Sequence, residues 1–329
     1  MNPPARGITV IGECVADAFT DPARSAPAQL ALNVLPGGGP ANTALALARL
    51  GTPTRFLARL SNDLFGTLFR NHLTASGVDL SGSVNAPEPS TLAIANLDEQ
   101  GQATYSFFAD GAADWQWTPD ELSTTVPDGD TVAVHTGSLA LIRQPGGRHI
   151  EDYLTKAREH ASISIDPNVR PLLVAPAAYH QRLHHWCALA DILRLSEDDL
   201  ALLLPGATPE EACDTWHAAG ARLVVITLGG RGALASLDGH RVTVPAPAVD
   251  VVDTVGAGDS FTAGLLHHLT ALGHLGGRLD TLTLDDTAAA CSFAARVAAL
   301  TCSVPGADPP WAALLTSPDT HDDHLQRQT

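Results

Sequence analysis

The sequence predicts an α/β domain built around a largely parallel sheet flanked by helices. Short β-rich runs alternate with alanine- and leucine-rich runs almost throughout the chain, a pattern typical of layered α/β folds. Gly51, Gly77 and Gly220 stand just past three of the alanine- and leucine-rich runs, where a left-handed helix cap favours glycine. Hydrophobic residues make up 45% of the 329 residues and charged residues 17%, so the chain can bury one large core or two smaller ones.

The apolar pattern places the elements in order along the chain. Buried strands are predicted at residues 8–11, 54–57, 131–135, 162–165, 192–195 and 223–227. Helices are predicted at residues 41–50, 63–75, 149–160, 209–219, 260–272 and 286–300.

Two early segments break this alternation. Residues 16–36 show no helical periodicity, and residues 90–108 have the pattern of two alternating strands around the turn sequence at 98–101. We expect the regions 16–36 and 90–110 to pair as a small β-sheet lid over the cleft of the main domain. The sequence therefore predicts a single domain over residues 1–316 with this lid inserted, followed by a polar C-terminal tail at 317–329.

The charge balance narrows the classes of partner. Asp and Glu outnumber Lys and Arg by 36 to 19, which gives a formal net charge of −17. This balance argues against nucleic acid or an anionic membrane surface as a partner. Lys156 is the only lysine, and no glycine stands beside it, so it is not a P-loop lysine. We therefore expect any phosphate to be held without lysine.

The cysteines and the N-terminus indicate a cytoplasmic protein. The five cysteines are widely spaced and contain no C-x-x-C pair, which favours buried thiols in a reducing compartment. The first apolar run, residues 8–11, is too short for the core of a signal peptide. No run reaches the roughly 18 apolar residues that a membrane span needs.

The most informative motif is the run Asp-Thr-Val-Gly-Ala-Gly-Asp-Ser-Phe at residues 253–261. A helix N-terminus attracts anions, and Gly256-Ala257-Gly258 lets a phosphate approach the backbone closely. Asp259 is a poor phosphate ligand, but it suits a base that takes a proton from an attacking hydroxyl. Taken alone, the motif also fits a glycine-rich turn with an acidic helix cap.

This run resembles the C-terminal motif of the ribokinase/PfkB family of sugar kinases, and a second motif of that family stands upstream at residues 37–42. The resemblance covers about residues 7–310 and implies a ribokinase-like fold. It also implies that Asp259 is the catalytic base and that the backbone of Gly256, Ala257 and Gly258 forms the anion hole.

The upstream motif, Gly-Gly-Gly-Pro-Ala-Asn at residues 37–42, suits a sugar. Its glycines give a backbone that can lie against a polyol, and Asn42 can donate and accept hydrogen bonds toward hydroxyls. The alternative is a simple loop and helix start. The resemblance implies that Gly38 and Asn42, with the adjacent Gly37, contact the sugar, and that Asp17 binds two of its hydroxyls.

The nucleotide side is predicted from two further segments. A T-x-G-x-x-G turn, with Thr227, Gly229 and Gly232, follows an apolar strand and resembles the stretch that binds adenine and ribose in the family; a hairpin turn is the alternative. Ser196 and Asp199 match a segment that usually reads N-x-x-E, or S-x-x-E among fructokinases. This implies nucleotide binding by Ser196 and a metal held by Asp199 through water, although the shorter acid departs from the pattern and equally fits a helix capping box.

A last segment bears on the sugar. Residues 166–170 resemble the D-x-N-x-R stretch of fructokinases and 2-keto-3-deoxygluconate kinases, which places Arg170 at the substrate site, facing phosphate or substrate, with a Pro-Asn turn as the alternative. Ala109 stands where these kinases often carry an arginine, which favours a neutral sugar. We expect phosphate to be held by backbone amides and Mg²⁺, with Arg170 and Arg194 as the only side-chain cations near the motifs that could assist.

Together these patterns predict an ATP-dependent sugar kinase, closest to the fructokinase-like branch, with fructose as the first choice of substrate. Ribokinase, 2-keto-3-deoxygluconate kinase and nucleoside kinase are the alternatives within the family. A sugar-sensing binding module on the same scaffold is the alternative outside the enzymes. The resemblance implies ATP and Mg²⁺, and it raises a monovalent cation such as K⁺ and a homodimer through the lid as further expectations.

Overall fold

The centre of the molecule is an eight-stranded sheet. The computed structural model describes residues 7–97, 103–123, 125 and 130–316. The strands lie in the order β14-β13-β12-β11-β10-β9-β1-β4, and those from β12 to β4 run parallel. In this order they are His240–Val244, Ala233–Leu237, Leu223–Thr227, Ile192–Ser196, Ser162–Asp166, Thr131–Gly137, Gly7–Ile11 and Thr54–Leu57. All the strands predicted as buried form this parallel part, so the predicted central sheet is confirmed.

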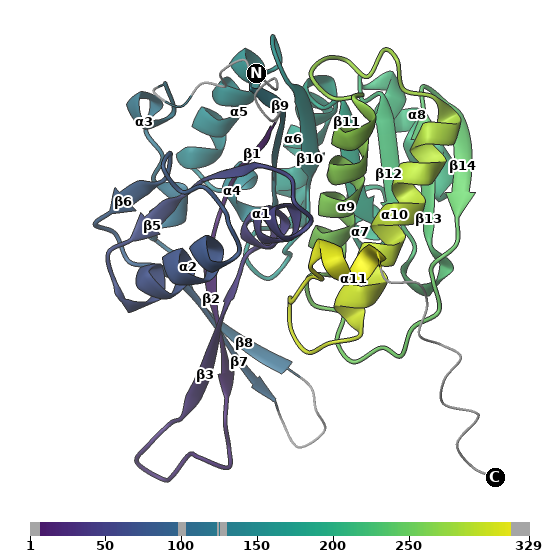
Figure 1. Cartoon of the computed structure of the whole chain (residues 1–329). Helices are drawn as coiled ribbons and strands as arrows, with labels where there is room; N and C mark the ends of the chain where they lie inside the picture. Colours follow the sequence, from purple (N-terminus) through teal and green to yellow (C-terminus); the bar gives the residue numbers. More distant parts are fainter. Residues whose placement is uncertain (1–6, 98–102, 124, 126–129, 317–329) are drawn as a thin grey trace, which may run out of the picture.

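Helices cover both faces of this sheet (Figure 1). On one face lie α1 (Gly39–Arg49), α2 (Leu64–Ala75), α9 (Ala257–Leu272) and α10 (Leu284–Cys302). On the other lie α4 (Ser138–Ile142), α5 (Gly146–Ala157), α6 (Pro176–Leu189), α7 (Glu197–Leu203) and α8 (Pro209–Ala218). The shorter elements are α3 (Pro119–Ser123), α11 (Ala312–Thr316) and the 3₁₀ turns η1 (Ala113–Trp115) and η2 (Gly229–Arg231). Because neighbouring strand residues face opposite ways, Val10 joins one core and Ile11 the other.

The predicted helices are all present, and their bounds differ from the predictions by at most three residues. Helix α9 begins at Ala257 rather than at residue 260, because Gly256 takes the left-handed conformation with φ of 75° and ends the preceding turn. Sequence reasoning missed α6, although its buried Tyr179, Leu183 and Trp186 follow a helical spacing.

A smaller sheet projects from the main body (Figure 1). It contains β3 (Leu32–Gly37), β2 (Val15–Thr20), β7 (Thr91–Leu97) and β8 (Ala103–Phe108), in that order. These strands come from the two segments that break the main pattern, so the predicted small sheet is confirmed. A separate pair joins β5 (Arg59–Ser61) to β6 (Val84–Ala86). The predicted turn at 98–101 and the tail at 317–329 lie outside the described residues.

Asp114, a buried residue of η1, ties the smaller sheet to the body. Its Oδ1 accepts a hydrogen bond from the backbone N–H of Cys14 at 2.9 Å, and its Oδ2 accepts one from the hydroxyl of Thr91 at 2.6 Å. Cys14 precedes β2 and Thr91 begins β7, so one carboxylate fixes the roots of the two central strands.

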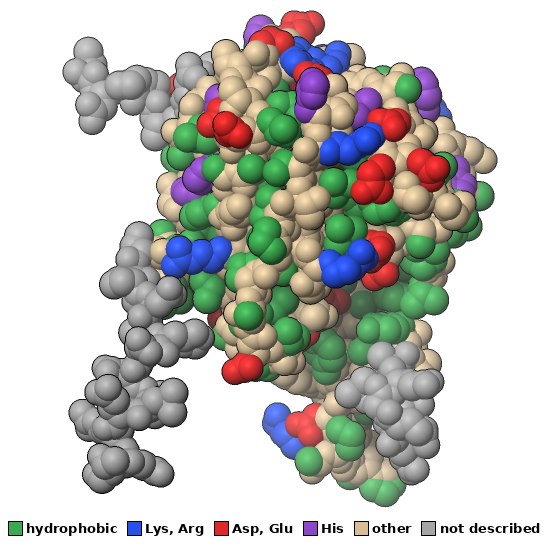
Figure 2. Space-filling view, turned by 90° about the vertical axis from the view of Figure 1, so that its right-hand side faces the viewer, with side chains coloured by type: hydrophobic (Ala, Val, Ile, Leu, Met, Phe, Trp, Pro, Cys, Tyr) green, Lys and Arg blue, Asp and Glu red, His purple; other side chains and the backbone are tan. Residues whose placement is uncertain are grey.

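The surface carries dispersed charge. On the face shown in Figure 2, the arginine and lysine side chains stand apart from one another and mostly beside acidic ones, instead of gathering in one basic patch. Across the part of the chain that the structure describes, no helix is both long enough and apolar enough to cross a membrane. The five cysteines are free; Cys302 is partly buried and the others are buried.

Candidate active site

The motif residues gather at one edge of the large sheet. Asp166 ends β10, Ser196 ends β11 and Thr227 ends β12, so the carboxyl ends of three neighbouring parallel strands meet there. The N-terminus of α9 lies at the same edge. In open α/β sheets this edge is where ligands bind.

The turn before α9 is built to present backbone N–H groups. Asp253 organises it, since its Oδ1 accepts from the N–H of Val255 at 3.0 Å and its Oδ2 from that of Gly306 at 2.8 Å. A side chain at Gly256 would stand 2.6 Å from the Cβ of Ala307, so only glycine fits. The amides that open α9 have no partners within the helix, and they carry its positive dipole end.

The carboxylate of Asp259 is held by the upstream motif. Its Oδ2 accepts a hydrogen bond from Nδ2 of Asn42 at 2.8 Å, although the two residues are 217 positions apart. Burial raises the pKa of Asp259 above its ordinary value, while the Asn42 hydrogen bond and the charges of Arg170 and Arg194 oppose that rise. The structure thus brings the two predicted motifs into direct contact.

A cavity of about 410 Å³, here called the acceptor cavity, opens beside Asp259. Its lining includes the predicted residues Asp17, Gly38, Asn42 and Arg170, together with Gly256 and Gly258. Gly37 does not line the cavity. It supports Asp17 instead, because a Cβ at Gly37 would stand 2.0 Å from Oδ2 of Asp17.

Besides Asp259, two further carboxyl groups that line the acceptor cavity have raised pKa values. Burial raises the pKa of Asp17 to about 6, against the opposing charge of Arg170. Burial likewise raises the pKa of Glu13 to about 7, although the backbone N–H of Ala140 donates to its Oε2 at 3.0 Å. Perturbed acids that line one cavity are typical of a functional site.

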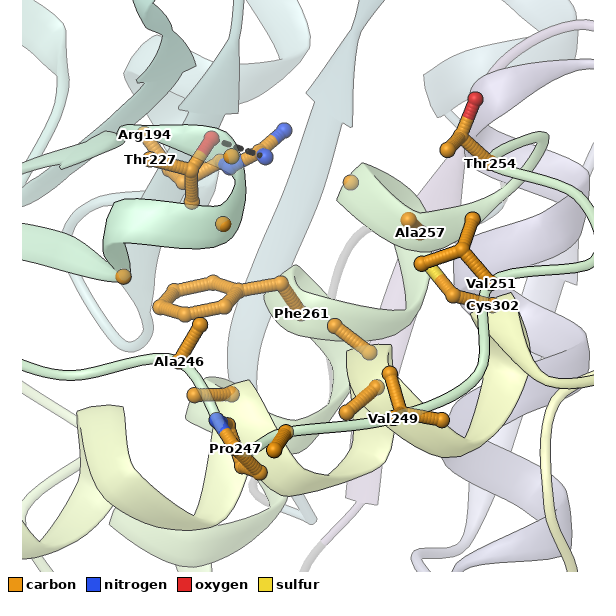
Figure 3. A pocket seen from close by; sticks show the side chains of 18 residues that line it. Arg194, Thr227, Ala246, Pro247, Val249, Val251, Thr254, Ala257, Phe261 and Cys302 are labelled. Atoms are coloured by element: carbon orange, nitrogen blue, oxygen red, sulfur yellow. Dashed lines mark hydrogen bonds between the residues drawn. The ribbon is translucent and has the colours of Figure 1, made fainter.

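A second cavity, of about 530 Å³, is here called the donor cavity (Figure 3). The predicted Thr227, Gly229 and Gly232 line it, as does Ala257. Much of the remaining lining is apolar, from the loop after β14 and from α9 and α10: Ala246, Pro247, Ala248, Val249, Val251, Phe261, Ala295, Ala298 and Ala299. Apolar walls around a few polar groups suit a flat heteroaromatic ring.

Ser196 and Asp199 lie outside both cavity linings and form the capping box of α7. The Asp199 N–H donates to Ser196 Oγ at 3.0 Å, and Asp199 Oδ2 accepts from the Ser196 N–H at 3.1 Å and from its hydroxyl at 2.6 Å. Asp199 Oδ1 accepts from the N–H of Val169 at 2.8 Å. The capping box that the sequence allowed is present.

Several residues of the site were not assigned to it by the sequence reasoning, which noted Arg194 only as a cation near the motifs. The acceptor cavity is also lined by Glu13, Ser138 and Asn168, and Arg194 lines both cavities. Each follows a predicted strand or interrupts its apolar run, which is the signal that points to this edge of the sheet. Ser138 and Asn168 also have positive φ angles, of 53° and 41°, a backbone feature that sequence does not reveal.

Comparison with known proteins agrees with this geometry. Residues 5–313 match the family described as pfkB family carbohydrate kinase. The chain belongs to this family. A fructokinase from Rhizobium leguminosarum bv. trifolii is 40% identical over 236 residues, which cover 71% of each protein.

Solved structures of fructokinases share the fold. One, from Vibrio cholerae O395 in fructose, ADP and calcium ion bound form, has a TM-score of 0.79 at 27% identity and covers 95% of this chain and 99% of its own. Another, from Xylella fastidiosa with bound ATP, has a TM-score of 0.84 at 25% identity and covers 94% of this chain and 97% of its own. The ribokinase-like fold expected from the motifs is thereby confirmed.

Proposed function

We propose that this pfkB-family chain is an ATP-dependent fructokinase. The observation that carries the proposal is the meeting of the two cavities at the turn before α9, with Asp259 on the acceptor side. Arg194, Thr254 and Gly258 line both cavities, so a group bound in one is adjacent to the other. The fructokinase relatives support the choice of sugar.

On the acceptor side, Asp259 takes the proton of a primary hydroxyl as that oxygen attacks the γ-phosphorus. Asn42 holds the carboxylate from one side, which leaves the other oxygen free for the sugar. Asp17 accepts from two further hydroxyls and Gly38 allows close approach, so the attacking oxygen is oriented before reaction.

On the donor side, the apolar walls hold the adenine and the Thr227–Gly232 turn holds the ribose. The amides at the start of α9 receive the γ-phosphoryl oxygens, where the developing charge needs fixed donors. No lysine takes part, in keeping with a chain whose only lysine, Lys156, lines a separate hollow of about 70 Å³.

The proposed Mg²⁺ ion would enter with the nucleotide and not be held by a cluster of protein ligands. No group of three or more His, Cys, Asp or Glu side chains is placed to hold a metal among the residues that the structure describes. Mg²⁺ usually keeps several waters and binds mainly through substrate phosphates, whose charge it neutralises. The predicted water-mediated contact of Asp199 with that ion stays a proposal; Asp199 lies outside both cavity linings and its carboxylate accepts three hydrogen bonds. A monovalent cation such as K⁺ belongs to the same proposal, and assays in K⁺ and Na⁺ buffers test it.

Two further parts of the proposal concern the setting of the enzyme. Phe19, Leu35, Tyr105 and Phe108 of the smaller sheet are exposed, which supports a homodimer through this lid, testable by light scattering. The free thiols support a reducing, cytoplasmic location.

A coupled ADP-release assay with Mg-ATP and a panel of sugars tests the function. The panel contains fructose, ribose, 2-keto-3-deoxygluconate and a nucleoside. We expect turnover on fructose with kcat/KM at least about tenfold above the others, in keeping with the fructokinase relatives. Ala109, in place of an arginine, counts in particular against the carboxylated 2-keto-3-deoxygluconate. Preferred turnover on another acceptor would overturn the fructose assignment, and binding without any turnover would favour a sugar sensor.

A further inference from the structure

One buried arginine stands between the two cavities. Arg194 lies in β11, is 5% exposed, and lines both the donor and the acceptor cavity. The other residues that line both are Thr254 and Gly258, which carry no charge. A phosphoryl group that moves from the donor to the acceptor cavity therefore passes the guanidinium of Arg194.

The neighbouring strands hold this guanidinium in place. Nη1 donates to Oδ2 of Asp166, at the end of β10, at 2.7 Å, and Nη2 donates to Oγ1 of Thr227, at the end of β12, at 2.7 Å (Figure 3 draws the second bond). The Cζ atom lies 5.7 Å from the centre of the Phe261 ring. The group is thus fixed from several sides before any ligand binds.

The guanidinium faces the anion-binding turn and has donors to spare. A Cβ at Gly258 would stand 2.8 Å from Nη1 and 3.0 Å from Nη2, so the cation lies directly against the backbone of that turn. An arginine carries five N–H donors. The buried Nε of Arg194 has no partner among the described residues, and a buried cation with unused donors suits an anionic ligand.

A cation at this point would reduce the repulsion between acidic groups and a bound phosphoryl group. Glu13, Asp17 and Asp259 line the acceptor cavity, against Arg170 and Arg194. Arg170 is exposed. A phosphoryl group adds negative charge beside Asp259, and like charges in a partly buried cavity repel strongly. Arg194, whose charge is shared with its partner Asp166, is the buried arginine that lines both cavities and can reduce that repulsion.

We propose that Arg194 is a catalytic residue that binds the transferring phosphoryl group. The proposal rests on the kinase function proposed above. In the transfer, the bond from the sugar oxygen to phosphorus forms while the bond from phosphorus to the bridging oxygen of ADP breaks. ADP leaves with that electron pair, and the proton of the sugar hydroxyl goes to Asp259. Arg194 bonds the phosphoryl oxygens on both sides of the transfer, as a bidentate fork can.

The test uses Arg194→Met and Arg194→Lys, with Arg241→Met as the matched control. Arg241 is also paired with an aspartate, Asp214, but lies outside both cavities. Arg194→Met should lower kcat by about 10³-fold, with the KM for fructose within about threefold of the unaltered chain. Arg194→Lys keeps the charge but loses the fork, so its kcat should fall by about 10- to 100-fold. Arg241→Met should leave both constants unchanged.

A binding measurement separates this role from a structural one. Calorimetry gives the affinity of each variant for ADP and for a non-hydrolysable ATP analogue. Loss of a charged contact to the terminal phosphate should lower the preference for the analogue over ADP by about tenfold or more. A merely structural role would weaken both nucleotides equally.

An unchanged analogue-to-ADP ratio in both Arg194 variants would overturn the role of Arg194, as would a kcat within threefold of the unaltered chain. Should Arg194→Met fail to fold, Arg194→Lys carries the same test. Absence of turnover by the unaltered chain on every sugar would instead overturn the proposed function, and the binding ratio would still decide the role of Arg194.

Discussion

Replacing Asp259 with asparagine removes the proposed base and changes little else. The new amide has the shape of the carboxylate, and its oxygen can still accept a hydrogen bond from Nδ2 of Asn42. In the unaltered chain this Nδ2 lies 2.8 Å from Oδ2 of Asp259. A general base contributes about 10²- to 10⁴-fold to the rate. At about 1.36 kcal/mol per tenfold, this raises the barrier by about 2.7 to 5.4 kcal/mol.

The same substitution should not destabilise the fold. Burial raises the pKa of Asp259 above its value in the unfolded chain, so the ionised carboxylate stabilises the folded state less than the protonated one does. This penalty is absent below the unfolded pKa and is fully present above the folded pKa. Asp259→Asn removes it, and we expect the melting temperature at neutral pH to stay equal or rise.

The assay is ADP release coupled to NADH oxidation, with affinities for ATP and fructose measured in parallel. Asp259→Asn should lose at least about 100-fold in kcat while both affinities stay within a few-fold. Asp250→Asn is the matched control, since Asp250 is an exposed carboxylate that lines neither cavity. Turnover by Asp259→Asn within about tenfold of the unaltered chain would refute the assignment of the base.

Other predictions follow from the same geometry. Gly37→Ala places a Cβ 2.0 Å from Oδ2 of Asp17 and should displace that carboxylate. The KM for fructose should then rise by about 10- to 100-fold, as expected for the loss of hydrogen bonds to a charged group. An unchanged KM in steady-state assays would contradict this. Burial raises the pKa of Asp17 to about 6 and also raises the pKa of Asp259. Both carboxyls therefore protonate at higher pH than ordinary carboxyls, and kcat/KM should fall as pH drops through about 6. A pH profile of kcat/KM that is flat from pH 5 to 8 would argue against this. Asp114→Ala leaves the N–H of Cys14 unpaired and should lower the free energy of unfolding, measured with urea, by about 1 to 3 kcal/mol. Asp114→Asn keeps an acceptor oxygen, so its free energy of unfolding should fall by less. Equal losses in the two variants would speak against the hydrogen bond as the cause. Chelation with EDTA should abolish turnover, and added Mg²⁺ should restore it; activity that persists in excess EDTA contradicts the metal requirement.

The sequence predicted the parallel part of the fold well because burial on both faces leaves a strong apolar signal. The six runs predicted as buried strands all became parallel strands of the sheet. The strand β13, Ala233–Leu237, was missed because its small residues Ala233, Ala235 and Ser236 carry little β preference. Its place is set by antiparallel pairing with β12, which is a tertiary effect.

The site was predictable where chemistry depends on a short motif and not where it depends on folding. Asp259 and Asn42 stood out in glycine-rich motifs, and the resemblance of these motifs to sugar-kinase motifs added Asp17 as a candidate. The contact between Asn42 and Asp259 spans 217 positions, so only the fold reveals it. Arg194 was noted as a nearby cation, but its position between the cavities depends on Asp166 and Thr227 of adjacent strands.

Asp17 and Asp259 lie on different parts of the molecule, and this bears on how the substrate preference of the chain could change. Asp17, Ala93 and Phe107 reach the acceptor cavity from the smaller sheet, whereas Asp259 belongs to α9 of the main body. If Asp17 binds the acceptor and Asp259 activates its hydroxyl as proposed, these two roles lie on different structural units, although Gly38 and Asn42 of the main body also line the cavity. On that proposal, substitutions in β2, β7 and β8 would change contacts to the acceptor while leaving the residues around Asp259 in place. We expect such substitutions to change which alcohol is preferred without abolishing phosphoryl transfer.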